Sequence, residues 1–292
     1  MRHMESGHYL CVGITVIDYT LGIVIFGTTI LGVTAGAMGV FALLRRQSLL
    51  GDAIAHAAFP GIVTAFLLTH SKDPALLMVG GSIAGCIGAL TVTMITHYSS
   101  LKKDAALGIV LSVFFGLGLV LMTITQKKPL ASQAVLNKFL FGNASTLLLE
   151  DVLIMACVGL AVIASMIFLK KEFVLVAFDS TYARAMGYPV LVLDSLLTLL
   201  LVLAICIGLQ TVGVVLMSTM LIAPAAAARQ WTYRLTPMIS IAALCGAIAG
   251  MSGSIISSMF ERMPTGPVIV VILSALVLFS LVCARIIKRT FQ

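Results

Sequence analysis

The stretch Arg45-Arg-Gln-Ser-Leu-Leu-Gly-Asp52-Ala-Ile-Ala-His56-Ala-Ala-Phe-Pro-Gly61 places an acid and an imidazole four residues apart in a mostly apolar chain. A spacing of four residues puts both side chains on one face of a helix. Ionisable side chains at membrane depth are expensive and are functional candidates by default, and Asp and His are ordinary ligands of first-row divalent metals. A structural interpretation also stands, in which Asp52 caps a helix at the membrane surface and His56 is a satisfied polar residue inside a bundle.

The composition indicates a helical membrane protein. The chain has 292 residues, of which 60% are hydrophobic and only 10% are charged, against about 25% charged in a soluble domain. Apolar runs long enough to cross a bilayer recur over residues 19–287, whereas a transmembrane barrel would show short alternating strands. We therefore expect an all-α, polytopic transmembrane bundle forming a single domain over 1–292. The net charge of +7 reflects where loops lie, so no nucleic-acid partner is expected.

The apolar runs predict eight or nine spans. The boundary between the sixth and the seventh is the least distinct, because only Leu209-Gln210 separates them and Pro224 interrupts the seventh. Broken helices or a re-entrant pair in this region would reduce the number of full spans. The nine expected ranges are 18–44, 51–70, 74–98, 105–125, 149–169, 190–208, 211–229, 235–258 and 266–287.

The distribution of basic residues predicts the orientation. With the N-terminus outside, the inner loops and tail hold twelve Lys and Arg residues and the outer side holds six, which accounts for all eighteen. Cytoplasmic loops normally carry such an excess, so we expect the N-terminus outside and the C-terminus in the cytoplasm. The long segment 126–150 is then outside, and we expect it to lie on the membrane surface or dip into it.

Small residues mark where helices are expected to touch. Glycine pairs spaced four residues apart occur at Gly32 and Gly36, at Gly81 and Gly85, and at Gly246 and Gly250. This pattern allows two helix backbones to approach closely within a membrane. We interpret all three pairs as packing sites, with a role in lining or gating a path as the minority alternative.

A second informative stretch, FDSTYARAMGYP, covers 178–189. Asp179 or Ser180 can cap a short helix, and Gly187 followed by Pro189 ends it. We therefore expect a short amphipathic helix at about 178–188, on the cytoplasmic face between two spans. Such a helix is a natural docking element for a cytoplasmic partner, although any loop can contain a helical turn.

Other ionisable side chains and catalytic motifs offer little. His70 and His97 fall at predicted span ends, and Asp194 lies close enough to the inner end of the sixth span to reach the interface. The sequence contains no GxxxxGK[ST], HExxH or GxSxG, so the signatures of a P-loop, a zinc protease and a serine hydrolase are missing. We expect a non-enzymatic chain that binds no ATP through a P-loop and holds no permanent cofactor.

Four motifs resemble a known family, the ABC-3 permeases, which are membrane subunits of ATP-binding-cassette importers for manganese, zinc and iron. The resemblance extends over nearly the whole chain, and its first motif is the most specific. The motifs are LLRRQSLLGDAIAHAAFPG (43–61), FDSTYARAMGYPV (178–190), VGVVLMSTMLIAPAAAAR (212–229) and PTGPVIV (264–270).

The resemblance implies a fold like that of type II ABC importers and a set of partners. Two permease copies, as a homodimer or a close heterodimer, would surround one path through the lipid of a bacterial plasma membrane. Two cytoplasmic ATP-binding subunits would supply energy, and an external metal-binding protein would deliver the ion. By the same resemblance, Asp52 and His56 are metal ligands. The coupling residues that contact the ATPase are Tyr182, Ala183, Arg184, Ala185 and Gly187.

The residues agree with this implied mechanism without choosing the metal. A two-fold axis along the path would unite two Asp52–His56 pairs into a four-ligand site. Carboxylate and neutral imidazole suit Mn²⁺, Zn²⁺ or Fe²⁺ as the transported ion, whereas Cu(I) prefers sulfur. The alternatives are a secondary transporter driven by an ion gradient, which typically carries an internal repeat that is not evident here, and a permease for a bulky iron chelate, which would need no metal ligand. A membrane enzyme is the least favoured class.

Overall fold

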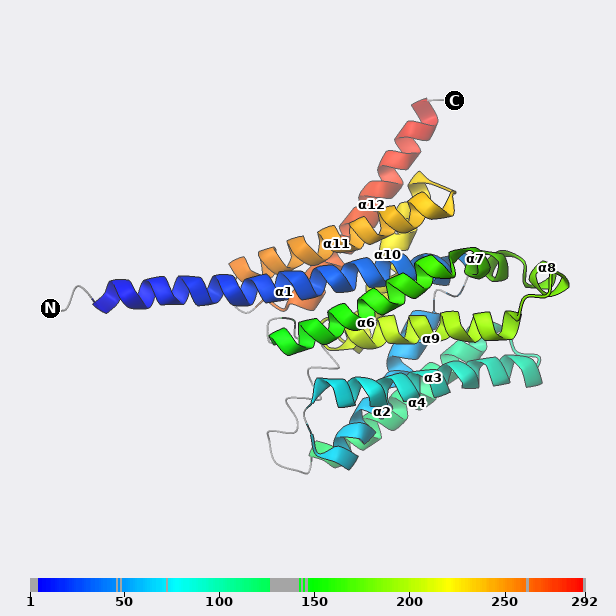
Figure 1. Ribbon diagram of the computed structural model, residues 1–292, viewed down its shortest axis with the longest axis horizontal. Helices are drawn as coiled ribbons and strands as arrows, with labels where there is room; N and C mark the ends of the chain where they lie inside the picture. Colours follow the sequence, from blue (N-terminus) through cyan, green and yellow to red (C-terminus); the bar gives the residue numbers. More distant parts are fainter. Residues whose placement is uncertain are drawn as a thin grey trace.

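The computed structural model describes residues 5–45, 47, 49–71, 73–126, 142, 144, 147–260 and 263–290. The regular structure of these residues is helical, with no strand among them (Figure 1). The helices in chain order are α1 (Glu5–Leu44), α2 (Leu50–Thr69), α3 (Pro74–Tyr98), α4 (Lys103–Gln126), α6 (Leu149–Phe168), α7 (Lys170–Phe178), α8 (Ser180–Ala185), α9 (Val190–Leu209), α10 (Val214–Trp231), α11 (Leu235–Met259) and α12 (Thr265–Thr290).

Eight of the helices in the described part of the chain are long and apolar enough to cross a membrane. They are α1 over its segment Tyr19–Leu44, α2, α3, α4, α6, α9, α11 and α12. A bilayer interior offers backbone N–H and C=O groups no water, so each spanning segment must satisfy them internally as a helix. The predicted polytopic, all-α architecture of eight to nine spans is confirmed.

The predicted seventh span, 211–229, corresponds to α10, which is not among these eight. This helix is short and rich in alanine, and Arg229 lies in its last turn. It packs against α1, α2, α9, α11 and α12, and its helical conformation continues through Pro224. The ambiguity at this point in the sequence is therefore resolved in favour of a buried helix in the middle of the bundle.

A buried turn joins α9 to α10. Gly213 adopts a left-handed φ of 87° directly before α10 begins, a conformation that costs glycine little because it has no Cβ. The hydroxyl of Thr211 donates to the carbonyl oxygen of Gly208 over 3.0 Å, which satisfies a polar group inside the protein. The turn therefore reverses the chain without leaving the bundle, and the two helices are separate elements.

Among the described helices, the most extensive contact joins α1 and α11. A Cβ atom added to Gly32 would collide with the backbone of Gly246, and one added to Gly250 would collide with the backbone of Thr28. The hydroxyl oxygens of Thr28 and Ser254 lie 2.8 Å apart and share a hydrogen bond. This interface, called the glycine seam below, confirms that both glycine pairs on these helices serve packing.

The third glycine pair also serves packing, between α3 and its neighbours. A Cβ atom added to Gly81 would lie 3.0 Å from the side chain of Ile62 on α2, and one added to Gly85 would lie 3.0 Å from Val202 on α9. These contacts bring α3 against two helices at once. They leave the opposite face of α3, which carries exposed apolar side chains such as Val79 and Ile83, to face outward.

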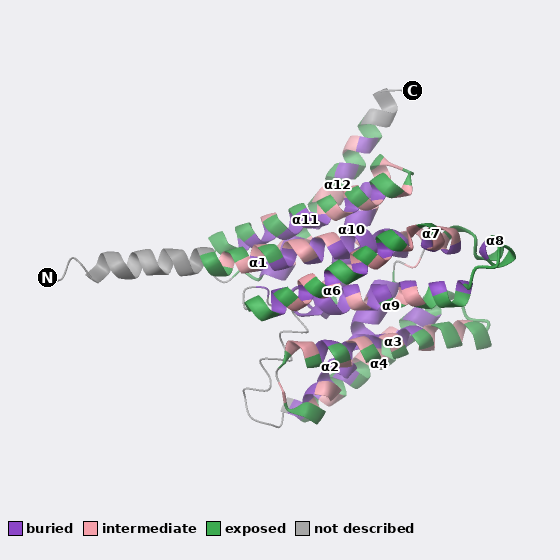
Figure 2. Ribbon diagram, in the orientation of Figure 1, coloured by how far each residue is buried: buried purple, intermediate pink, exposed green. Residues whose placement is uncertain are grey.

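Buried side chains concentrate along the middle of the bundle, and exposed ones lie on its outer helices (Figure 2). Many of the exposed side chains are large and apolar, for example Leu160 of α6, Val120 of α4 and Val271 of α12. In water such a surface would be unstable, but lipid tails are as apolar as these side chains. The outward apolar faces are those expected of helices surrounded by membrane.

The structure contains one described helix that the sequence analysis missed. Residues 170–178, which lie between the expected span 149–169 and the expected short helix, form α7, which packs against α9. Phe173 and Val176 are its buried side chains, and their spacing of three residues is the signal that could have predicted a helix. The expected surface location of 126–150 lies mostly outside the described residues.

Candidate functional site

Asp52 and His56 face each other on the first two turns of α2. Nε2 of His56 lies 3.4 Å from Oδ1 of Asp52, and the side chains are 10% and 28% exposed, respectively. The helix begins after Leu49, and no side chain caps it. The two residues therefore share one helix face, as their spacing predicted, and Asp52 is not the helix cap that the structural interpretation required.

The imidazole of His56 is held from the side by Phe115 of α4. The two ring centroids lie 4.4 Å apart with an interplanar angle of 74°, an edge-to-face arrangement. Nδ1 of His56 is buried and has no hydrogen-bond partner among the described residues. Only Nε2 therefore faces a polar neighbour, and it is the nitrogen available to share an ion with the carboxylate of Asp52.

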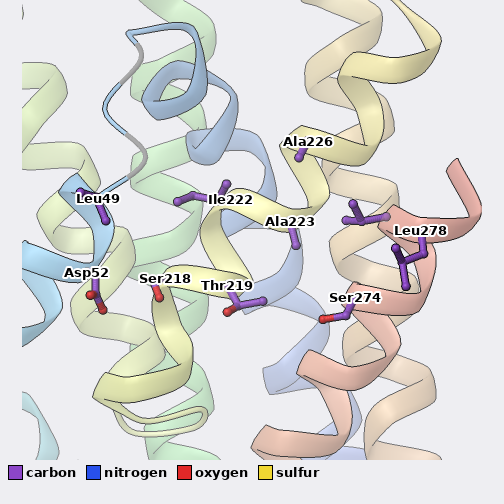
Figure 3. A pocket seen from close by; sticks show the side chains of 10 residues that line it. Leu49, Asp52, Ser218, Thr219, Ile222, Ala223, Ala226, Ser274 and Leu278 are labelled. Carbon is purple, nitrogen blue, oxygen red and sulfur yellow. The ribbon is translucent and has the colours of Figure 1, made fainter. Parts of the chain in front are cut away.

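Asp52 also lines a pocket of about 540 Å³ between α2, α10 and α12. Figure 3 shows the carboxylate of Asp52 on one wall, with Ser218 and Thr219 of α10 and Ser274 of α12 on the others. His56 is not among the described residues that line it. The lining is formed by Leu49, Asp52, Ser218, Thr219, Ile222, Ala223, Ala226, Ser274, Val277 and Leu278.

The pocket places Asp52 away from the ends of the bundle. Ser274 and Leu278 of α12 lie in the middle of that helix's apolar segment, Thr265–Ile286. Because Asp52 lines the same pocket, the first turn of α2 lies level with the middle of α12 rather than with either end. A carboxylate at this position is in the setting where an ionisable side chain needs a partner, a hydrated path or an ion.

A single copy of the chain has few described side chains near Asp52 and His56 that could bind a metal ion. Within the described part of the chain, no three His, Cys, Asp or Glu side chains gather closely enough to hold a metal ion. Asp52 and His56 supply one oxygen ligand and one nitrogen ligand from a single helix. A firmly bound metal ion usually takes four or more ligands, so these two side chains alone are too few to hold one.

The short helix predicted at about 178–188 is present as α8. The carboxylate of Asp179 accepts hydrogen bonds from the backbone N–H groups of Thr181 at 3.0 Å and Tyr182 at 2.9 Å. The helix ends at Ala185, and Gly187 follows with a left-handed φ of 82°. Of the two predicted candidates for the cap, Asp179 and Ser180, the structure has Asp179, and Gly187 lies in the terminating turn as predicted.

Four of the five predicted coupling residues lie in α8, and the fifth, Gly187, follows it. Ala183 is fully buried, which fixes the short helix against its neighbours α7 and α9. Tyr182, Arg184 and Ala185 are exposed, as is Gly187 just beyond the helix. α8 lies at one end of the bundle, and α1 begins at the other (Figure 1). The exposed residues therefore form a small surface at a single end of the molecule.

The sequence analysis missed an ion pair between the end of α1 and α9. Nη2 of Arg45, which directly follows α1, lies 2.6 Å from Oδ1 of Asp194 on α9. Burial lowers the pKa of the Arg45 guanidinium, and the charge and hydrogen bond of Asp194 act in the opposite direction. The pair connects the segment leading into α2 with the helix that follows α8. The available signal was that both residues lie near the predicted inner ends of their spans.

Comparison with known proteins places this geometry in context. The sequence profile of the ABC 3 transport family matches residues 18–284. The manganese transport system membrane protein MntC of Bacillus subtilis is 45% identical over 261 residues, which are 89% of this chain and 60% of that protein. The zinc transport system membrane protein TroC of Treponema pallidum is 44% identical over 264 residues, covering 90% of this chain and 89% of that protein.

A solved structure has the same arrangement of helices. PsaBC from Streptococcus pneumoniae, determined in complex with Fab, contains a chain that superposes with a TM-score of 0.79 at 33% identity. The match covers 89% of the present chain and 90% of the other. The family profile, which matches residues 18–284, includes the helices that carry Asp52, His56 and the surface around α8.

Proposed function

The chain belongs to the ABC 3 transport family, and we propose that it is the permease subunit of an ATP-driven importer for a divalent transition-metal ion. The strongest support is the Asp52–His56 pair, in which Nε2 of His56 lies 3.4 Å from Oδ1 of Asp52. Asp52 also lines a pocket beside the middle of α12. Relatives named for manganese and zinc transport indicate the same class of cargo. Metal is thus the substrate that passes through the protein.

A second copy of the chain supplies the ligands that one copy lacks. Two copies related by a two-fold axis present the same surface to each other, so two carboxylates and two imidazoles meet at one ion. Mn²⁺, Zn²⁺ and Fe²⁺ all accept this donor set. A site divided between two subunits can also open as they move, which suits an ion that must be released.

The surface around α8 is the docking site for two ATP-binding subunits, one on each permease copy. Tyr182, Arg184 and Ala185 present the contact surface, and buried Ala183 anchors the helix to the bundle. α8 then faces the cytoplasm of a bacterial cell. α1 begins at the opposite end of the bundle (Figure 1). In this proposed orientation the N-terminus is outside, where an external binding protein delivers the ion. The orientation is the one predicted from the excess of basic residues in the inner loops.

The direct test is metal uptake by vesicles that contain the chain assembled with its ATP-binding subunit and binding protein. We expect ATP-dependent uptake of Mn²⁺, Zn²⁺ or Fe²⁺ by the wild type and its loss in Asp52→Ala and His56→Ala. His97→Ala, at the end of α3, is the matched control and should transport normally. Uptake that survives ATP depletion but is lost when the proton gradient is dissipated would instead identify a secondary transporter.

Two outcomes would change the assignment of the metal-binding residues but not the assignment of the chain as a permease. Normal metal uptake by His56→Ala would remove the imidazole from the path. Uptake of a metal chelate, with little effect from Asp52→Ala, would indicate a permease whose cargo needs no metal ligand. Co-purification of each variant with the ATP-binding subunit shows whether assembly is intact, so a loss of uptake can be assigned to the site.

The docking role of α8 has a separate test. Arg184→Glu reverses an exposed charge on the proposed contact surface, and Gly187→Pro replaces a residue whose φ of 82° proline cannot adopt. Both variants should lower the stimulation of ATP hydrolysis by the metal-loaded binding protein. Full stimulation in both variants would contradict the assignment of this surface.

A further inference from the structure

Part of the surface of α10 lines the pocket that also contains Asp52. The other side chains of α10 are mostly buried against neighbouring helices, including the sulfur-containing Met217 and Met220, which are fully buried. The partly accessible residues Ser218, Thr219 and Ile222 line the pocket. The donor atoms that α10 offers to the pocket are therefore hydroxyl oxygens, and its soft sulfur atoms are turned away.

These two hydroxyls differ from many others in the apolar helices. The hydroxyl of Thr64 donates to the carbonyl oxygen of Pro60 at 2.7 Å, and that of Thr34 to Ile30 at 2.9 Å. Ser274, across the pocket, donates to Val270 at 2.9 Å. Ser218 and Thr219 make no hydrogen bond with any other described residue. Both residues are partly accessible and line the pocket, so their hydroxyls can bind water or an ion there.

From this contrast we propose that Ser218 and Thr219 are specificity-determining residues, which offer oxygen ligands to the transported ion directly or through its bound water. The inference rests on the proposed function and adds a part of the path that the Asp52–His56 pair does not include. The carboxylate of Asp52 lines the same pocket, so an ion leaving the imidazole of His56 would meet this carboxylate and the two hydroxyls.

The few oxygen donors in this mostly apolar pocket would discriminate between the candidate metals. Carboxylate, water and hydroxyl oxygens suit Mn²⁺, whereas imidazole and thiolate favour the metals later in the first row, including Zn²⁺. The two hydroxyls therefore favour Mn²⁺ relative to Zn²⁺. Loss of the hydroxyls leaves His56 as the main discriminating ligand and shifts the preference toward Zn²⁺.

The test compares Mn²⁺ and Zn²⁺ uptake by the assembled transporter carrying Ser218→Ala and Thr219→Val together. Valine keeps the shape of threonine and removes only the hydroxyl. A hydroxyl that reaches the ion through its bound water contributes a charge-assisted hydrogen bond, which is enough for about a tenfold effect, so we expect the Mn²⁺ to Zn²⁺ uptake ratio to fall about tenfold. Thr123→Val is the matched control, because its hydroxyl donates to Leu119 at 2.9 Å on an exposed face of α4.

A second variant separates the hydroxyl from the packing of the side chain. Thr219→Ser keeps the hydroxyl and loses only a methyl group, so it should retain the wild-type ratio while Thr219→Val does not. A ratio unchanged in the double variant, an equal fall in uptake of both metals, or a Thr219→Ser ratio matching Thr219→Val would each overturn the proposal.

Metal uptake by the wild-type assembly tests the proposed function separately from the role of the two hydroxyls. Failure of the wild-type assembly to take up any of the metals would remove the proposed function itself. Wild-type uptake combined with an unchanged Mn²⁺ to Zn²⁺ ratio in the double variant would remove only the role of the two hydroxyls. Equilibrium binding of Mn²⁺ alone to the purified assembly should weaken in the double variant and stay normal in Thr123→Val.

Discussion

The glycine seam and the pocket beside Asp52 use similar residues for opposite purposes. At the seam, Gly32 and Gly246 bring the backbones of α1 and α11 into contact, and the hydroxyls of Thr28 and Ser254 bond to each other at 2.8 Å. At the pocket, α10 offers small and hydroxyl-bearing residues to an open volume of about 540 Å³. A small or polar residue within a membrane helix is therefore structural or functional according to what lies opposite it.

The physical basis of the difference is how polar and small groups are satisfied in lipid. Helices in a bilayer gain little from burying apolar surface, so close packing and interhelical hydrogen bonds hold them together. The seam provides both. The pocket provides neither of these for Ser218 and Thr219. Their hydroxyls are therefore left to bind water or an ion. Four substitutions test this comparison.

The largest effect is expected from Gly32→Leu in the seam. Its side chain would occupy the space of the Gly246 backbone, so the helices must separate, at a cost of about 3 kcal/mol. Gly22→Leu is the matched control in the same helix, because a Cβ atom there has no neighbour within 4 Å. SDS-induced unfolding of the purified protein measures both, and equal stability of the two variants would show that the seam is not rigid.

A smaller loss is expected from Asp194→Asn. Arg45 is 8% exposed, while Asp194 is 54% exposed, so solvent screens the pair and we expect its loss to cost about 1 kcal/mol. The variant tests whether the end of α1 is held as firmly as its middle. In a double-mutant cycle with Arg45→Gln, a coupling energy near zero would mean that this contact contributes nothing to the fold.

Ser254→Ala should have a still smaller effect. It removes the hydrogen bond to Thr28 at the seam, and such bonds between membrane helices contribute about 0.6 kcal/mol. The same unfolding experiment measures the change. If the variant is as stable as the wild type, backbone packing alone stabilises the glycine seam.

The smallest effect on stability is expected from Ser218→Ala. The substitution is chemically the same as Ser254→Ala, but no bond to another described residue is lost, so the free energy of unfolding should change by less than about 0.5 kcal/mol. A loss as large as that of Ser254→Ala would show that the Ser218 hydroxyl is structural, which would remove the contrast between the two regions.

Much of the local structure could be read from the sequence. The spacing of Asp52 and His56 predicted their shared helix face, and Asp179 and Gly187 predicted the start and end of α8. The helix α7 was missed because its short apolar pattern falls within a region that also carries charges. The depth of α10 in the bundle was not predicted either, since an alanine-rich segment interrupted by Pro224 is compatible with several arrangements.

The sequence by itself determined the class of protein and the helices, because long apolar runs in lipid have few ways to satisfy their backbone other than as helices. It also determined that an acid and an imidazole share one face of α2. Only the tertiary structure decided that Ser254 meets Thr28 while Ser218 meets an open pocket, and that Arg45 meets Asp194. These pairings depend on the rotation and depth of each helix against its neighbours, which arise from packing among residues distant in the chain.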